Sequence, residues 1–332
     1  MPPARTSLFA APPAHPSQSG RRRMVTALAL APLAACQAPR PPLRVGSIVF
    51  PGYEFLFLAR ELELLDPREL RPIEMSSSVD VLRALAVGQL EAAQLTLDET
   101  VSARAEGLAL SLLAVLDVSA GADVVMARPA IRRPEDLRGR RIGVEQGATG
   151  AVLLGAMLHA HGLRVDEVIK VPVSLNSSAD VFEREHLDAV VTAEPWATQL
   201  AERGAHRLYD SRATPGLIVD VLAMRPDVLQ QRPDSTRTLV AALFRARELH
   251  QRAPAVTAPL MAPRLQVRPA EVAKVFDGLE LPNVTRNHEL LKPGGVVQQG
   301  AERLQTFMVE QRLLRRAAPL ADLIDTRFLP AA

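Results

Sequence analysis

The sequence contains one cysteine, Cys36, among its 332 residues. A lone cysteine excludes disulfides within the chain and any metal site that is built on several thiolates. The stability of the fold therefore has to come from its core, and 48% of the residues are hydrophobic. Roughly 290 residues, the length left after the processing described below, suffice for one large domain or two lobes.

The N-terminal region lacks an apolar run of the length that a bilayer requires, which is about 20 residues. Its first residues are rich in proline and have no hydrophobic period, so we expect no helix and no packed core there. Arg21, Arg22 and Arg23 precede the short apolar run 24–35, a pattern that is typical of a secretory signal. We predict that residues 1–35 are a signal peptide, and the choice between the general secretory and the twin-arginine route stays open.

Cys36 ends the segment Leu33-Ala34-Ala35-Cys36, which resembles the bacterial lipobox. This resemblance predicts that Cys36 carries a lipid, and that residues 36–42 form a short, Pro-rich extended tether. The alternative is an ordinary small buried cysteine. That alternative fits less well, because Cys36 lies between an apolar run and a Pro-rich stretch. We therefore expect an exported, membrane-anchored periplasmic lipoprotein, attached to either the inner or the outer membrane.

The formal net charge of the whole chain is +2. Cleavage before Cys36 removes four arginines and no acidic residue, which leaves 35 basic residues against 37 acidic ones. The mature chain is thus near −2, and nothing in it indicates a nucleic-acid partner.

From Leu43 onward, short β-type runs alternate with amphipathic helical runs, which is typical of an α/β architecture. Strands are expected at residues 43–49, 73–75, 92–97, 111–118, 122–127, 141–145, 168–171, 187–192 and 217–224. Helices are expected at residues 55–65, 79–87, 151–161, 179–185, 233–251, 269–276 and 294–314. Residues 147–150 are expected to form a tight turn.

Several short segments carry a family resemblance. The first is GYEFLFLAR at residues 52–60, just after the first expected strand, and the second is VGQLEAA at residues 87–93. The third is DLRGRRIGVE at residues 136–145, which is matched later by DAVVTAEPW at residues 188–196. In this order and spacing they resemble the periplasmic solute-binding proteins of the SsuA/TauA/THI5-like (NMT1-like) group, which serve ABC importers.

The resemblance implies the type II periplasmic-binding-protein fold, which consists of two α/β lobes with a ligand cleft between them. Residues 43–122 and 221–332 would form lobe I, and residues 123–220 would form lobe II. In open α/β sheets, ligands bind outside the carboxyl ends of the strands, and a cleft between lobes can close by a hinge motion. The expected protein is a monomer that works with a small-molecule ligand and an ABC permease.

The candidate ligand-binding residues are side chains that lie at or just past the expected strand ends or at the two places where the resemblance implies that the chain crosses between the lobes. They are Tyr53, Glu54, Ser76, Ser77, Thr96, Asp98, Asp117, Ser119, Asp123, Glu145, Thr149, Glu194, Trp196 and Asp220. Structural roles are the alternative for some of them. Glu54 would serve equally well at the start of a helix, Ser77 or Ser78 would cap the helix that follows them, and Asp98 has the same alternative. Trp196 would serve as a core residue.

The candidate set is acidic, whereas sites for anions usually offer Arg, Lys or several hydroxyl and amide donors. The group that the chain resembles includes binders of sulfonates, nitrate and pyrimidines. We therefore hypothesise a cationic or donor-rich ligand, such as an amine or an aminopyrimidine-like ring that stacks on Tyr53 or Trp196. A sulfonate- or nitrate-type anion binder stays open as an alternative.

The sequence has no Gly-x-Ser-x-Gly elbow, P-loop, dinucleotide fingerprint or His-Glu-x-x-His motif. We therefore predict neither an enzyme nor a cofactor or metal. A second role stays open, in which the protein senses its ligand for a membrane signalling partner instead of an importer.

Overall fold

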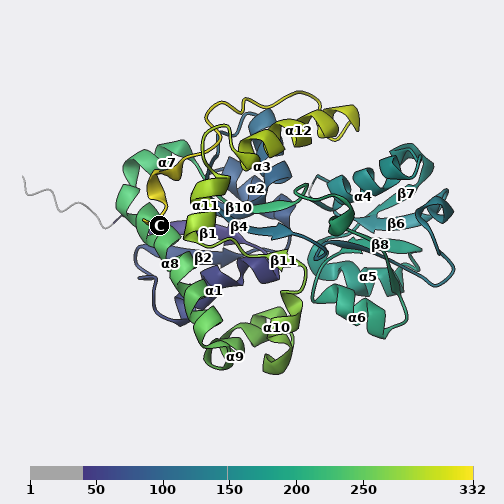
Figure 1. Ribbon diagram of the computed structural model, residues 1–332, viewed down its shortest axis with the longest axis horizontal. Coiled ribbons are helices and arrows are strands. Elements are labelled where there is room, and N and C mark those ends of the chain that lie inside the picture. Colours follow the sequence, from purple (N-terminus) through teal and green to yellow (C-terminus); the bar gives the residue numbers. More distant parts are fainter. Residues whose placement is uncertain (1–39, 148, 332) are drawn as a thin grey trace, which may run out of the picture. The chain divides into compact units, whose positions relative to one another are not determined.

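The computed structural model of the protein describes residues 40–147 and 149–331 (Figure 1). The predicted signal peptide, Cys36 and most of the predicted tether lie outside the described residues. The chain from Pro41 onward forms one compact unit. Among the described residues, no helix is both long enough and apolar enough to span a membrane.

The first β-sheet has six strands in the order β11-β4-β10-β3-β1-β2. Its strands are β1 (Leu43–Ser47), β2 (Leu70–Glu74), β3 (Ala92–Thr96), β4 (Ser111–Ser119), β10 (Val219–Met224) and β11 (Leu279–Glu280). β1 is parallel to β2 and β3, and β10 lies antiparallel between β3 and β4. The carboxyl ends of β1, β3 and β4 therefore meet the first residues of β10 at one edge of this sheet.

The second β-sheet has five strands in the order β7-β6-β8-β5-β9. Its strands are β5 (Val124–Ala127), β6 (Arg141–Val144), β7 (Ile169–Pro172), β8 (Ala189–Thr192) and β9 (His206–Asp210). β6 is parallel to β7 and β8, and β5 lies antiparallel between β8 and β9. The chain passes between the two sheets twice, from β4 to β5 and from β9 to β10. We call the six-stranded sheet with its helices lobe I and the five-stranded sheet with its helices lobe II.

Helices cover both sheets. Those of lobe I are α1 (Glu54–Glu61), α2 (Ser78–Ala86), α3 (Leu97–Ala105), α7 (Pro226–Gln231), α8 (Pro233–Arg252), α9 (Pro254–Leu265), α10 (Val272–Val275), α11 (Val284–Leu290) and α12 (Val296–Glu310). Those of lobe II are α4 (Thr149–Ala160), α5 (Ser178–Arg184) and α6 (Trp196–Glu202). Figure 1 shows α1 on one side of the six-stranded sheet and α2 and α3 on the other.

The buried apolar side chains form one large core in lobe I and two smaller clusters in lobe II. All five residues of β3 are buried, since helices pack on both faces of the sheet at its centre. This central position makes the end of β3 a rigid support for the residues that follow it.

The expected strands of both sheets are present, with shifted ends. The strand expected at residues 73–75 runs instead from Leu70 to Glu74, because it pairs in register with β1 over five residues. Helix α4 already begins at Thr149, within the turn that was expected at residues 147–150. The pattern did not predict α3, α6, α7, α9, α11, β9 or β11.

Candidate functional site

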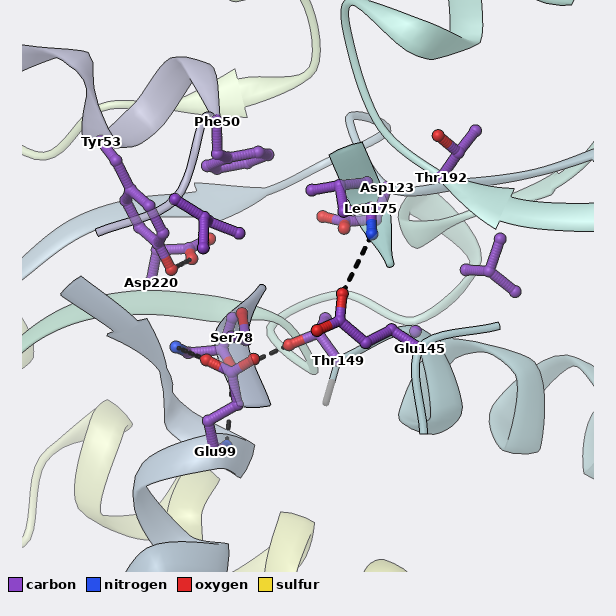
Figure 2. Close-up of a pocket in the computed structure, with 14 residues that line it drawn as sticks. Phe50, Tyr53, Ser78, Glu99, Asp123, Glu145, Thr149, Leu175, Thr192 and Asp220 are labelled. Atoms are coloured by element: carbon purple, nitrogen blue, oxygen red, sulfur yellow. Dashed lines mark hydrogen bonds between the residues drawn. The ribbon is translucent and has the colours of Figure 1, made fainter. Parts of the chain in front are cut away.

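A pocket lies at the edge where the carboxyl ends of β1 and β3 meet the start of β10 (Figure 2). The empty space between its walls is about 550 Å³. Both lobes contribute to its walls. The lining residues are Ile48, Phe50, Tyr53, Ser78, Thr96, Glu99, Asp123, Glu145, Thr149, Gly150, Leu175, Val191, Thr192 and Asp220.

Tyr53 and Asp220 form one wall of the pocket (Figure 2). Tyr53 lies in the short 3-10 helix η1 (Pro51–Tyr53), which follows β1, and its buried hydroxyl donates a hydrogen bond to the carboxyl group of Asp220. The second oxygen of Asp220, Oδ2, is buried and has no hydrogen-bond partner among the described residues. Burial, followed by the charge of Asp117, raises the pKa of Asp220 well above its usual value.

Asp117 lies directly behind Asp220. It is the residue of β4 that pairs with Asp220 of β10, and its side chain is fully buried. Its neighbour Gly52 leaves it room, since a Cβ at Gly52 would lie 1.8 Å from Asp117 Oδ2. Burial raises the pKa of Asp117 to about 7. The end of the sheet thus holds two adjacent carboxyl groups.

The N-terminus of α3 supplies a further acidic group to the pocket. Thr96 and Glu99 form a capping box, in which Glu99 Oε2 accepts a hydrogen bond of 3.0 Å from the Thr96 amide. Burial and the neighbouring charge of Asp98 raise the pKa of Glu99 to about 8. A carboxyl group with that pKa is mostly protonated at neutral pH.

Thr149 at the start of α4 joins lobe II to this end of lobe I. Its Oγ1 lies 2.7 Å from Thr96 Oγ1 and 2.9 Å from Asp98 Oδ1, and all three side chains are buried. Asp98 therefore faces the contact between the lobes instead of the pocket.

The lobe II side of the pocket carries two more carboxyl groups. Glu145 follows β6, and its Oε2 accepts a hydrogen bond of 3.0 Å from the Leu175 amide, the contact drawn as a dashed line in Figure 2. Asp123 lies where the chain crosses from β4 to β5, and burial raises its pKa to about 6. Asp123 Oδ2 and Glu145 Oε1 are buried without a partner among the described residues.

The pocket is therefore acidic and rich in acceptors. Four carboxyl groups line it, those of Glu99, Asp123, Glu145 and Asp220, whereas none of the described residues that line it is Lys, Arg or His. The buried Arg247 and the largely buried Arg264, both in lobe I, bind other groups. Such a site can accept hydrogen bonds, hold protons or balance a positive charge.

Six of the predicted site residues line the pocket, namely Tyr53, Thr96, Asp123, Glu145, Thr149 and Asp220. Asp98 and Asp117 lie just behind them. Ser119 is buried in the β4–β5 crossover, where its Oγ lies 2.7 Å from Ser211 Oγ. This hydrogen bond links the β4–β5 connection to the β9–β10 connection, the two segments that join the lobes.

The remaining five predicted residues lie outside the pocket and have partners of their own. Glu54 pairs with Arg264 inside lobe I. Ser77 caps α2 by accepting from the Asp80 amide, and the exposed Ser76 donates to the Asp80 carboxylate. Glu194 accepts from the Thr198 amide in α6.

Trp196 begins α6 and is buried in a hydrophobic cluster of lobe II. The structure therefore gives Trp196 a core position, and Tyr53 and Phe50 are the aromatic side chains at the pocket.

Sequence reasoning missed Glu99 and the apolar wall of the pocket. Glu99 had a detectable signal, because Thr96-Leu97-Asp98-Glu99 matches the capping-box pattern of a helix start. Apolar residues such as Ile48 and Leu175 carry no such signal, since they resemble core residues.

A family model described as "NMT1/THI5 like" matches residues 69–256, which is more than half of the chain. A curated protein of Brucella abortus (strain 2308) that is named as a binding protein is 22% identical over 179 residues, covering 50% of this chain and 55% of that protein. The chain thus spans about half the length of the curated relatives it matches.

Several solved structures share the fold. The alkanesulfonate-binding protein SsuA from Xanthomonas axonopodis pv. citri, bound to MOPS, has a TM-score of 0.73 at 20% identity, covering 87% of this chain and 99% of that one. The periplasmic nitrate-binding protein NrtA from Synechocystis PCC 6803 has a TM-score of 0.68 at 12% identity, with coverages of 84% and 83%. A ligand-binding component of an ABC-type import system from Staphylococcus aureus, with zinc bound, has a TM-score of 0.72 at 13% identity, with coverages of 87% and 98%.

At these identities the likeness shows the fold, and it confirms the expected architecture of two α/β lobes. The family match confirms the resemblance that the short sequence segments indicated. The chain belongs to the NMT1/THI5-like family and has the fold of the periplasmic binding proteins.

Proposed function

We propose that the protein is an extracytoplasmic solute-binding protein that captures a small cationic or donor-rich molecule between its lobes. The observation that carries this proposal is the acidic pocket, in which Asp123, Glu145 and Asp220 each bury an oxygen without a partner among the described residues. Buried acceptors that lack a donor cost free energy. A ligand with N–H donors and a positive charge would satisfy these oxygens and balance their charge.

The other walls of the pocket favour a compact ligand with a flat or apolar part. Phe50 and Tyr53 meet edge to face, with ring centroids 5.2 Å apart. Ile48, Leu175 and Val191 add aliphatic surface. An amine or an aminopyrimidine-like ring has both properties, since it combines a small apolar body with several N–H donors.

The same observation disfavours the anionic alternative. The related structures are named as binders of an alkanesulfonate and of nitrate, but their low identity to this chain carries no ligand class over. An anion needs charge-assisted donors, and the described lining offers no basic side chain to supply them. Ionised carboxyl groups at this site would repel a sulfonate.

The setting of this function is the cell envelope. We propose that the mature protein is anchored through a lipid on Cys36 and delivers its ligand to an ABC permease as a monomer. The resemblance at the lipobox and the membership in the NMT1/THI5-like family support this setting.

A thermal-shift panel of small amines, aminopyrimidines, sulfonates and nitrate tests the proposed ligand class. A cation at a hundred times its Kd should stabilise the protein by about 2.7 kcal/mol. For a chain of this size that is a rise in Tm of roughly 4–5 °C. Sulfonates and nitrate should give no rise.

Asp123→Asn is the informative variant in this panel, because it removes a charge from the pocket and keeps the shape of the side chain. It should lose most of the stabilisation by cations. Asp234→Asn is the matched control, since the Asp234 side chain is 96% exposed, at the start of α8. A larger shift with sulfonate or nitrate than with every cation would overturn the proposal.

A further inference from the structure

Asp117 and Asp220 form a buried pair of carboxyl groups without a cation between them. They are direct partners in the antiparallel pairing of β4 with β10, and the two residues are 0% and 2% exposed. Neither oxygen of Asp117 has a donor among the described residues, and the same holds for Asp220 Oδ2. Two adjacent buried carboxylates repel each other strongly, so one of the two has to hold a proton.

The titratable groups around this pair come from four other segments. Tyr53 from η1 donates a hydrogen bond to Asp220, which favours the ionised form of that carboxyl group, whereas the charge of Asp123 from the β4–β5 crossover raises the pKa of both members of the pair. Glu99 from α3 acts on Tyr53. Asp123 therefore disfavours a second charge on the pair.

Arg247 from α8 is the one basic group that acts on the pair among the described residues, and it acts at a distance. Its Nη1 donates to the backbone carbonyl of Pro282. Arg247 therefore reduces the repulsion without forming an ion pair with Asp117.

We propose that Asp117 and Asp220 hold one proton between them in the ligand-free protein, and that capture of a cation releases this proton to solvent. The step is an exchange: the O–H bond of one carboxyl group breaks, the proton leaves, and the ligand's positive charge replaces it. This inference rests on the proposed function, because it takes the ligand to be a cation.

The exchange makes Asp117 a determinant of ligand charge although it does not line the pocket. While the pair holds its proton, the cation has to displace it, so the affinity should rise about tenfold per pH unit below the pKa of the pair. The affinity should level off above that pKa. Burial raises the pKa of Asp117 to about 7 and that of Asp220 well above its usual value, so this change lies at or above neutral pH.

The shared proton should also make the stability of the ligand-free protein depend on pH. In the unfolded chain Asp117 and Asp220 titrate near their ordinary pKa, about 3.9, whereas in the folded protein the pair titrates higher. Between these values the folded state binds more protons than the unfolded state, so its stability falls as the pH rises. The stabilisation that the protons of the pair provide is fully present below the pKa of the unfolded chain. It is lost as the pH rises through the pKa of the folded pair.

Asp117→Asn tests the shared proton, because the amide keeps the shape of the side chain and can donate to Asp220 as the proton does. Wild-type protein and variant are melted without ligand at about pH 5.5 and about pH 8. The Tm of the wild type should fall more than that of the variant as the pH rises from about 5.5 to about 8. We expect the difference between the two falls to be roughly 5 °C. A purely structural role for Asp117 would lower the Tm equally at both.

Infrared spectroscopy supplies an independent readout of the same proton. The wild-type protein at neutral pH should show the carbonyl band of a protonated carboxylic acid, with a component that disappears in Asp117→Asn and in Asp220→Asn. The shared proton would be overturned by two results together. The Tm would change by the same amount between the two pH values in wild type and variant, and the carbonyl band would be the same in wild type and both variants.

Benzamidine, a planar cation that stays charged across this pH range, tests the exchange itself. Calorimetric titrations near pH 6.5 in two buffers of different ionisation enthalpy count the protons that binding releases. We expect about one per benzamidine for the wild type and fewer for Asp117→Asn. Binding without release would overturn the exchange and leave the proposed function standing. If the Tm and infrared results hold but neither benzamidine nor any cation of the panel binds, the proposed function and the exchange both fail.

Discussion

Replacement of Arg264 by methionine should lower the free energy of unfolding by about 3–5 kcal/mol. Arg264 lies in α9 and binds Glu54 in α1, whose side chain is 1% exposed, and it also pairs with Glu74 of β2. Its guanidinium lies 3.5 Å from the centroid of the Phe57 ring. Methionine keeps much of the packing but leaves the Glu54 carboxylate buried without its cation, which is the main cost.

The effect of Arg264 should extend to the pocket. Its Nη2 donates a hydrogen bond of 2.7 Å to the carbonyl of Ile48, which begins the loop that carries Phe50 and Tyr53. Loss of this anchor loosens the wall that contains Tyr53, so ligand binding should weaken together with stability.

Arg60→Met is the matched control for this experiment. Arg60 also lies over the Phe57 ring, 5.3 Å from its centroid, but it pairs with the exposed Glu61. An exposed pair contributes about 0–1 kcal/mol, so denaturant unfolding should barely change. Adding Glu54→Gln to Arg264→Met should restore part of the lost stability, because it removes the unpaired charge. Equal losses in the Arg264 and Arg60 variants would contradict the account.

Gly52→Ala should disrupt the pocket by displacing Asp117, which lies behind Asp220. The added Cβ would lie 1.8 Å from Asp117 Oδ2 and 2.7 Å from Asp117 Cγ, and Asp117 is held within β4. Either η1 or Asp117 has to move, which separates Tyr53 from Asp220 or Asp117 from Asp220. We expect a loss of about 1–3 kcal/mol in stability from overpacking. The affinity for a cation should fall at least about tenfold, as expected for a lost charge-assisted contact of about 1.5–3 kcal/mol.

Gly300→Ala controls for the glycine-to-alanine change itself. A Cβ at Gly300 would meet nothing within 4 Å, and the residue lies inside α12. Alanine there should stabilise the helix by roughly 0.5–1 kcal/mol and leave binding unchanged. The measurements are denaturant unfolding and calorimetric titration of each variant. A Gly52→Ala protein with wild-type affinity would show that the packing of Gly52 on Asp117 does not matter for the site.

The position of the pocket followed from the order of strands and turns. Parallel strands direct their carboxyl ends to one edge, so Tyr53 after β1 and Thr96 at the end of β3 were expected to lie close together. Asp220 lies at the start of the antiparallel β10, and it was expected there because the family resemblance places the return of the chain to lobe I near it. Local pattern was sufficient for the first two residues, because the direction of a strand decides at which edge the following residue lies.

Local pattern failed where the outcome depends on distant partners. Glu54 follows the first strand as directly as Tyr53 does, but it turns away from the pocket to bind Arg264, which is 210 residues further along the chain. Helix α9, which carries Arg264, contains Pro259 and Pro263, and prolines inside a helix argue against predicting one. The sequence therefore did not predict Arg264 as the partner of Glu54, for two reasons: it is far away along the chain, and its helix was not predicted.

Glu99 illustrates a different cause. Helix α3 is buried on almost all sides, including Asp98, Glu99 and Arg104, so its sequence has no clear apolar face. Without a predicted helix, Glu99 was not placed near the end of β3. The capping-box pattern at Thr96 was the signal that would have found it.

Calorimetric titration with two ligands of the same ring and opposite charge tests the central claim most directly. Benzamidine and benzenesulfonate are similar in size and shape, so their difference in affinity reports the charge that the pocket selects. The acidic lining predicts measurable binding of benzamidine, weakened in Asp123→Asn, and no binding of benzenesulfonate. The account would be contradicted if benzenesulfonate bound to the protein and benzamidine did not.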